Sequence, residues 1–470
     1  MGVTTFKFFL FLSATFGIYQ SIPDKYKKGF LIFSSFLFYF SYGIKGTLIV
    51  FLYVLLTYCF GFIAKSRKRL ILLLILTLIP LFLNKYYPFL HPLFFLDLYV
   101  GNISILGISF FTFKAVAYIV ESYKRNNFRP SFCDYLLYMI FFPTCLSGPI
   151  EDIDVFLKKS SNTEKITWDR FTDSLLTIMY GLAIKLVFAD RIIGIINAIY
   201  SNYDTYTRYN IVAVLSYPLY IYADFAGYSF IAEGVGKLFG YDLVRNFKQP
   251  YFSISTKEFW NRWHCSLNNW LRTYIYIPLG GNKKGKVRKY LNIMIVFMIS
   301  GIWHGAGPGF MIWGFINGAF QIVGDLLNPL RERANSKFHL NHLSFSKEIK
   351  MLTVFLLISL TWVFFSQGTD AFSIIASVFL ERKLSVTDFV FSVCADAQSS
   401  KIELLIIALS FLLLVFVDIM EEKNKGCLCM KIEKSAVLRF AVFLLLFFFI
   451  LLFGRYGSGY DASNFVYFDF

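Results

Sequence analysis

The chain has 470 residues, of which 57% are hydrophobic, 20% aromatic and only 16% charged. No segment is polar enough to form a soluble domain, and this composition is typical of a polytopic membrane protein. The net charge of +16 comes from short basic clusters between apolar runs, as topology signals do. No nucleic-acid-binding motif accompanies these clusters, so we expect no nucleic-acid partner.

The N-terminal quarter alternates apolar runs with charged loops. The runs suited to spanning helices lie at about 6–22, 29–43, 47–65, 70–84 and 103–120. The first run has no basic flank and no cleavage site, so we expect a retained helix. The positive-inside rule places the N-terminus outside and three basic loops in the cytoplasm: 25–28, 66–69 and 121–129.

The pattern becomes irregular after Arg129. The apolar run 134–150 is interrupted by Pro143 and Pro149, which is typical of a re-entrant or half-spanning helix. The aromatic, basic segment 248–289 lacks a spanning run and predicts amphipathic helices in the membrane interface. The remaining spans are predicted at about 175–200, 211–239, 290–304, 308–326, 350–366, 402–419 and 436–453.

These patterns predict an all-α, polytopic integral membrane protein. We count roughly 10 to 12 transmembrane helices, with re-entrant and interfacial helices in addition. We interpret the chain, 1–470, as one membrane domain. Its expected parts are N-terminal helices at 1–130, a core at 131–326 that contains the motif region 257–320, and C-terminal helices at 327–470.

Two of the five histidines lie in the motif region. His304 ends an apolar run between Gly301 and Gly305, which would leave room for a substrate chain beside the ring. Burial would keep the imidazole neutral and able to accept a proton. His264 lies in an aromatic, basic segment. Function is favoured for His304, with a structural histidine as the alternative, whereas His264 fits an interfacial anchor as well as a positioning group.

A third candidate is the carboxylate of Asp224, which shares a predicted helix face with Tyr228. At membrane depth it needs a partner such as an arginine or a tyrosine hydroxyl. It could orient an imidazole or join two helices. No metal site is expected, because the cysteines and histidines lack metal-ligand spacing. A transporter of a lipid-linked sugar would use His304, Asp224 and Glu233 as a path, but the internal repeats typical of transporters are not seen.

Three sequence motifs are highly specific: Phe-Trp-x-Arg-Trp-His-x-Ser-Leu-x-x-Trp-x-Arg at 259–272, Tyr-Ile-Pro-Leu-Gly-Gly-Asn at 276–282 and Ser-Gly-Ile-Trp-His-Gly at 300–305. Supporting motifs lie at 107–113, 148–150, 224–229, 362–365 and 465–470. Together these motifs resemble the membrane-bound O-acyltransferase family. Within the family, the chain is most similar to the bacterial alginate and peptidoglycan O-acetylases and is related to the D-alanyl-lipoteichoic acid transfer protein.

The resemblance implies a helical fold around a central funnel, with His304 and His264 as catalytic residues. It implies transfer of an acyl group, acetyl in this branch, from a cytoplasmic thioester across the membrane to a polysaccharide hydroxyl. The donor would be acetyl-CoA or an acyl carrier, with no bound cofactor. An extracytoplasmic esterase-like partner and a bacterial inner-membrane location are also implied. D-alanyl transfer to teichoic acid is the alternative within the family.

Further residues in the matching motifs are candidates for positioning substrate or donor: Trp263, Arg262, Arg272, Asn261, Ser266, Trp303, Asp224 and Tyr228. The chain departs from the family pattern at Thr273, Asn317 and Ser366, where aspartate, histidine and arginine are usual. The basic segment 281–289 could attract the phosphates of a CoA-like donor or anchor the chain on the cytoplasmic side, and the sequence favours the anchor.

Overall fold

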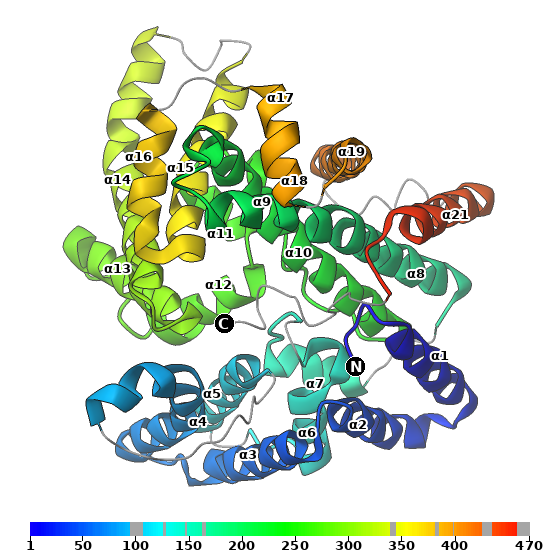
Figure 1. The fold of residues 1–470 in the computed structure, drawn as a ribbon. Helices are drawn as coiled ribbons and strands as arrows, with labels where there is room; N and C mark the ends of the chain where they lie inside the picture. Colours follow the sequence, from blue (N-terminus) through cyan, green and yellow to red (C-terminus); the bar gives the residue numbers. More distant parts are fainter. Residues whose placement is uncertain are drawn as a thin grey trace. The chain divides into compact units, whose positions relative to one another are not determined.

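The computed structural model describes residues 1–94, 107–125, 128–145, 148–161, 166–338, 345–380, 385–397, 399–424 and 435–457. Within these ranges all regular elements are helices and no strand occurs, as predicted (Figure 1). The terminal motif at 465–470 lies outside the described residues. The chain divides into two compact units. The first holds the described residues of Met1–Gly181, Tyr228–Arg245 and Tyr456–Phe470, and the second holds those of Leu182–Gly227 and Asn246–Arg455.

Seven candidate membrane spans occur among the described residues, judged by length and composition. They are Ile44–Ile63, Arg67–Tyr86, Thr207–Leu238, Pro308–Ala334, Ser346–Leu380, Lys401–Lys423 and Ala436–Phe453. The sequence-based count was higher because it included shorter helices such as α1 (Phe6–Ser21) and α2 (Asp24–Phe40), with 16 and 17 residues. A straight span of the hydrocarbon core takes about 20 residues. The chain is therefore an integral membrane protein.

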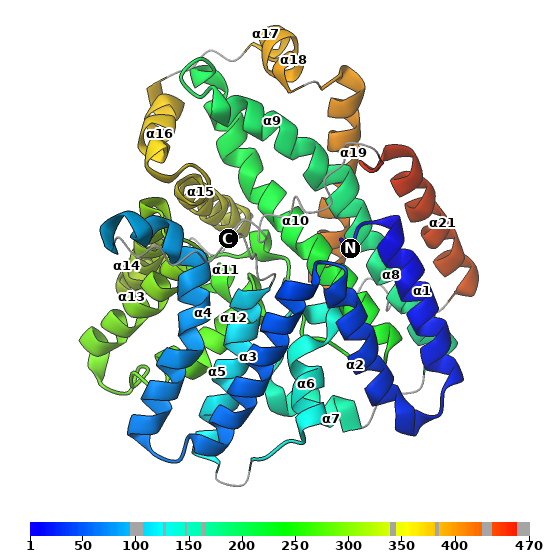
Figure 2. The ribbon, with the colours of Figure 1, turned by 60° about the horizontal axis from the view of Figure 1, so that its bottom comes forward.

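The first unit contains most of the N-terminal helices. Here α3 (Ile44–Ile63) packs against α5 (Ile108–Lys124), and α5 also packs against α4 (Arg67–Phe94), as Figure 2 shows. The interrupted run predicted at 134–150 forms only a nine-residue helix, α6 (Phe132–Ile140), and a single 3-10 turn (Phe142–Thr144). This agrees with a helix too short to span the membrane.

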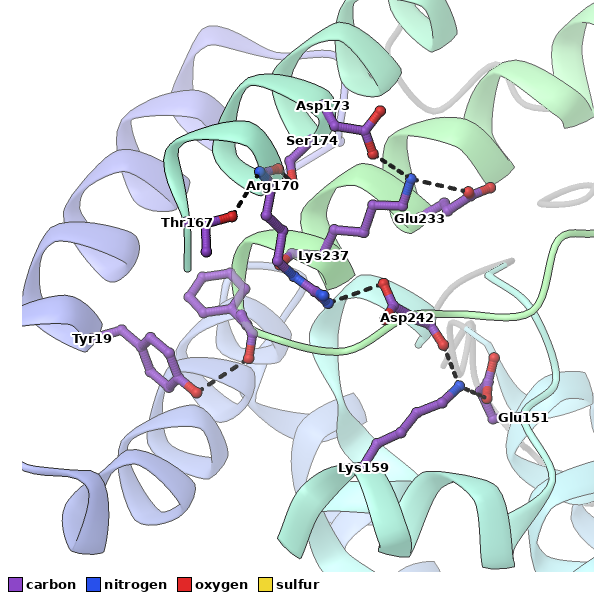
Figure 3. A network of polar contacts seen from close by, with 11 residues as sticks. Tyr19, Glu151, Lys159, Thr167, Arg170, Asp173, Ser174, Glu233, Lys237 and Asp242 are labelled. Atoms are coloured by element: carbon purple, nitrogen blue, oxygen red, sulfur yellow. Dashed lines mark hydrogen bonds and ion pairs between the residues drawn. The ribbon is translucent and has the colours of Figure 1, made fainter. Parts of the chain in front are cut away.

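A network of ion pairs holds the segment that follows α10 (Asn210–Leu238) in the first unit (Figure 3). Arg170 binds the carboxylate of Asp242 at 2.9 Å, and the ammonium of Lys159 lies 3.2 Å from buried Glu151. Glu151 also accepts the backbone N–H of Val244. Burial raises the pKa of this carboxyl group, which the ammonium of Lys159 and the N–H bond oppose.

Glu233, a member of the proposed transporter path, belongs to the same structural network. It lies 3.5 Å from Lys237, whose ammonium also binds Asp173 at 2.8 Å (Figure 3). Tyr19 donates a hydrogen bond to the carbonyl of Phe239 at 3.1 Å. These contacts tie the end of α10 to α1 and α8 (Trp168–Ala183), so they account for Glu233 without a transport role.

The second unit contains the motif region. The predicted interfacial helices are short: α11 (Thr256–Arg262), α12 (Cys265–Leu271) and a π-helical turn (Arg272–Tyr276). They are followed by α13 (Gly285–His304) and α14 (Pro308–Phe338), which form a hairpin. The helix α15 (Ser346–Gln367) packs against α14 (Figures 1 and 2).

The described part of the same unit includes six further helices. They are α9 (Asp190–Ser201), α16 (Ala371–Leu380), α17 (Val386–Asp388), α18 (Cys394–Asp396), α19 (Lys401–Asn424) and α21 (Ala436–Phe453). A π-helical turn, Ile184–Ala189, precedes α9 and packs against α19. A π-helical turn widens the helix locally. Such turns are rare and appear often at functional sites.

Candidate active site

His304 is the last residue of α13 and is 3% exposed. Its ring lies among aromatic rings of three helices: the ring centroids of Trp303, Trp313 and Phe365 are 4.6, 5.2 and 4.9 Å away. Phe310, near the start of α14, lies at 6.5 Å. The cage of Trp303, Phe310, Trp313 and Phe365 is apolar and excludes water, which strengthens any electrostatic interaction that the imidazole makes.

The glycines around His304 serve helix packing. A Cβ atom on Gly301 would lie 2.4 Å from the carbonyl oxygen of Phe310, and one on Gly305 would lie 2.3 Å from the Phe310 ring. The sequence interpretation expected room for a substrate chain beside these glycines. The structure fills that space with α14, because residues without a side chain allow two helices to approach closely.

His264 lies between α11 and α12 with a left-handed backbone (φ 43°), and it is 2% exposed. Its ring packs edge-on against Phe225 of α10, with centroids 4.7 Å apart. His264 occupies the N-cap position of α12 but makes no side-chain cap. Asn246 supplies the cap instead: its backbone carbonyl accepts from Cys265 N–H at 2.9 Å, and its Oδ1 accepts from Ser266 N–H at 3.3 Å.

Burial lowers the pKa of His264 to about 3. The imidazole is therefore neutral at physiological pH, and it can accept or donate a hydrogen bond but carries no charge. The residue lies outside the seven candidate spans. A neutral, rigidly held imidazole suits positioning better than cycles of protonation.

Aromatic side chains connect the two histidine regions within the second unit. Trp263, next to His264, has its ring centroid 5.1 Å from that of Trp362 on α15. Trp362 in turn lies 5.0 Å from Phe365, which contacts His304. The two histidines, forty positions apart in sequence, are thus parts of one aromatic cluster.

Asp224 is fully buried, and a lysine is among its partners. The ammonium of Lys185, in the π-helical turn before α9, binds Asp224 and also binds Asp190 at 2.7 Å. Asp224 therefore joins two helices, one of the two alternatives in the sequence interpretation. Sequence reasoning missed Lys185 as the partner, although an unexplained lysine inside an apolar run was a visible signal.

A model of the membrane-bound O-acyltransferase family matches residues 36–367, which include the cage around His304 and the turn at His264. The chain belongs to the membrane-bound O-acyltransferase family.

Three bacterial relatives illustrate the range of activities near this chain. It is 32% identical over 55% of its length to the probable alginate O-acetylase of Pseudomonas putida, and 33% identical over 55% to the peptidoglycan O-acetyltransferase of Helicobacter pylori. It is 34% identical over 51% to the teichoic acid D-alanyltransferase of Bacillus subtilis. The matches cover 52%, 53% and 64% of those relatives, so the chain spans about half to two thirds of their length.

The other candidate residues of the O-acyltransferase motifs differ in how far their side chains are exposed to solvent. Ser266 and Trp303 are buried, whereas Asn261 and Arg272 are exposed. Arg262 forms ion pairs with Glu258 and with Glu422 of α19, each at 2.6 Å. Tyr228 is buried on α10 in the first unit. Their roles in positioning substrate stay predictions.

The described residues contain no group of three or more histidine, cysteine, aspartate or glutamate side chains that could hold a metal ion. Asn317, where a third histidine is usual in this family, is fully buried one turn after Trp313. Its Nδ2 donates to the Trp313 carbonyl at 2.9 Å. The side chains of His304, Asn317 and Trp313 offer imidazole, amide and indole groups at the site.

Proposed function

We propose that this O-acyltransferase family member transfers an acetyl group from a cytoplasmic thioester to a hydroxyl of a cell-surface or exported polysaccharide. The observation that carries the proposal is the buried His304 within its aromatic cage, at the position of the family's histidine motif. A buried imidazole is costly unless it is paired or functional, and this one lies at the end of α13 where an acyl group can be kept from water.

In this mechanism, His304 accepts the proton of the attacking hydroxyl as the oxygen forms a bond to the thioester carbonyl carbon. The carbon–sulfur bond then breaks, and the thiolate takes the proton from the imidazolium, so that ester and free thiol are the products. General-base help of this kind contributes about 10²- to 10⁴-fold. His264, neutral and fixed by the Asn246 cap, positions the donor.

The same proposal includes the acyl donor, the membrane in which the protein lies and a partner protein. The donor is acetyl-CoA or an acyl carrier thioester, and the protein lies in a bacterial cytoplasmic membrane with its N-terminus outside. The exposed lysines of the segment 281–289 support a cytoplasmic placement of that segment. A separate esterase-like protein outside the membrane completes transfer to the polymer.

D-alanyl transfer to teichoic acid is the second candidate within the same chemistry. It is favoured by the 34% identity to the Bacillus subtilis teichoic acid D-alanyltransferase. The two reactions share the attack of a hydroxyl on a thioester and differ in the acyl group and the polymer.

The test is the content of ester-linked acids in isolated surface polymers, released by base and identified by mass. Cells with the wild-type protein are compared with His304→Ala at matched membrane abundance, and His91→Ala, outside the motif region, is the control. Loss of acetate from one polymer in His304→Ala alone supports the proposal and names the acceptor. Loss of D-alanine selects the alternative. Unchanged esters in every polymer overturn the acyltransferase role of His304.

A further inference from the structure

Two candidate membrane spans of the first unit end at the same short turn. The span Ile44–Ile63 is α3, the span Arg67–Tyr86 lies on α4, and residues 64–66 connect them. The chain leaves the hydrocarbon core where a span ends, so this turn lies at the depth of the lipid headgroups. The phosphate groups of the lipids are therefore the anions nearest to it.

The turn is strongly basic. Its cationic side chains are all exposed, and they are Lys65, Arg67, Lys68 and Arg69. No ion pair joins any of them to another residue in the part of the chain that the structure describes. Like charges this close together repel one another, so the turn attracts an anion that balances them.

A further cation comes from the segment after α5. The guanidinium of Arg129 lies over the ring of Phe62 in the last turn of α3, 5.2 Å from the ring centroid. Tyr58, one turn earlier, donates a hydrogen bond to the carbonyl of Pro130 at 3.1 Å and holds this segment beside the helix. A ring beneath a cation fixes its position without neutralising its charge, so Arg129 adds positive charge next to the turn.

The neighbouring cations at the end of α5 are already neutralised. This helix packs beside α3 (Figure 2). Lys124 and Arg125 bind the buried carboxylate of Glu121 at 3.0 and 2.8 Å, and Arg125 also binds Asp154 at 2.6 Å. These carboxylates are thus occupied by other cations. The remaining positive side chains, which we call the basic turn, are Lys65, Arg67, Lys68, Arg69 and Arg129.

Exposed apolar side chains border the basic turn. Phe62 and Ile63, in the last turn of α3, are 40% and 46% exposed, and Ile71 and Leu72, in the second turn of α4, are 50% and 56% exposed. A free phosphate would contact the cations only, and an acidic protein surface would leave the apolar side chains uncovered. An anionic phospholipid supplies a phosphate for the cations and acyl chains for the apolar border.

We propose that the basic turn binds the headgroup of an anionic phospholipid, with the acyl chains of the lipid against the bordering apolar side chains. The phosphate lies among the cations of the turn, and Arg129 on its aromatic support closes one side of the site. A bound lipid stabilises the first unit by mass action, because the unfolded chain does not present the cations together. The site is separate from the acyl-transfer chemistry proposed for His304.

The experiment measures lipid binding to the full chain by native mass spectrometry. Protein in detergent micelles is titrated with phosphatidylglycerol, which is anionic, and separately with zwitterionic phosphatidylcholine of the same acyl chains. Glycerol 3-phosphate carries the phosphate without acyl chains and serves as the free-anion competitor. The variant with Arg67→Gln and Arg69→Gln removes two cations of the basic turn.

We expect the wild type to bind phosphatidylglycerol more tightly than phosphatidylcholine. Each basic residue beside an anionic lipid surface contributes about 5-fold in affinity, so the double variant should bind phosphatidylglycerol about 10- to 30-fold more weakly. Its affinity for phosphatidylcholine should stay within about 2-fold. Added salt should reduce the preference of the wild type, and equimolar glycerol 3-phosphate should leave it unchanged.

Arg125→Gln is the matched control. Arg125 is exposed at the end of α5, but the carboxylates of Glu121 and Asp154 already balance its charge. Its replacement should change the affinity for phosphatidylglycerol by less than about 2-fold. Thermal unfolding in neutral detergent without added lipid shows whether each variant is folded.

Four results would overturn the inference. They are equal affinity of the wild type for the two lipids, wild-type affinity for phosphatidylglycerol in the double variant, the same loss in Arg125→Gln as in the double variant, and displacement of phosphatidylglycerol by equimolar glycerol 3-phosphate. The last would identify a site for a free anion, in which acyl chains have no part. None of these results bears on acyl transfer, which the polymer-ester assay with His304→Ala tests separately.

Discussion

Replacing Gly301 with alanine tests whether the spacing of α13 and α14 controls activity. The new Cβ would lie 2.4 Å from the carbonyl oxygen of Phe310, about 0.9 Å closer than the shortest ordinary carbon–oxygen contact of about 3.3 Å. Both atoms are fixed to helix backbone, so the helices must separate by about that distance, at a cost of about 1–3 kcal/mol.

The separation should also disturb the cage. His304 follows three residues later on α13, whereas Trp313 of the cage is on α14. A shift of about 1 Å between reacting groups can cost about 100-fold in rate, so we expect kcat for acetyl transfer to fall about 10- to 100-fold in Gly301→Ala.

Two glycines of the same hairpin serve as matched controls. A Cβ on Gly318 would meet the sulfur of Met294 at 3.0 Å, which a flexible side chain can relieve, and one on Gly307 has its nearest neighbour at 3.7 Å. Both alanine variants should keep kcat within about 2-fold. The assay is ester formation in vesicles, with thermal unfolding measured in detergent. Wild-type kcat in Gly301→Ala would refute the link between helix spacing and catalysis.

Three further predictions concern stability. Lys185→Met removes the cation that two buried carboxylates share and should lower the free energy of unfolding by about 3–5 kcal/mol. Lys185→Met combined with Asp224→Asn should recover part of this loss, and no recovery in chemical unfolding would contradict the pairing. Glu422→Gln breaks an ion pair with Arg262 in which both side chains are partly exposed to solvent. A loss of about 0.2–1 kcal/mol is expected in the same assay, and a loss above about 3 kcal/mol would contradict a solvent-screened pair. Unfolding releases His264 from an environment that lowers its pKa to about 3, so the unfolded chain binds a proton below about pH 6.5 and the folded chain does not. Stability should therefore fall by about 2 kcal/mol between pH 8 and pH 5, and His264→Gln should remove that part of the pH dependence; an unchanged profile would contradict the neutral, buried imidazole.

The two histidines can be singled out from the sequence as candidates because their signals are local, and their catalytic roles stay predictions. A histidine at the end of an apolar run and a histidine within an aromatic, basic motif are visible without tertiary contacts. The all-helical membrane fold was also predictable, since apolar runs of about 20 residues have few alternative structures in a bilayer. The partner of Asp224 was not, because Lys185 lies 39 positions away and only tertiary packing brings the two together.

The local conformation at His264 was beyond sequence reasoning for a related reason. A non-glycine residue with positive φ is uncommon, and among the described residues only Gln249 and His264 adopt it. No turn motif predicts the conformation here. It persists because Asn246, about twenty positions upstream, caps α12, and because the N–H of Lys248 binds the carbonyl of Arg262 at 3.0 Å.

The acidic end of α19 also helps to hold the segment around His264 in place. Three carboxylates lie in the last two turns of α19, where the helix dipole disfavours negative charge. Each is compensated by a group near the His264 turn: Asp418 accepts from the hydroxyl of Tyr222 at 3.0 Å, Glu421 accepts from the side-chain amide of Gln249, and Glu422 pairs with Arg262. Because these contacts hold Gln249 and Arg262, which precede His264 in the chain, the position of His264 depends on a helix that contributes no residue to the aromatic cage. Substitutions at the end of α19 should therefore act on the rate through His264, even though α19 is remote in sequence from both histidines.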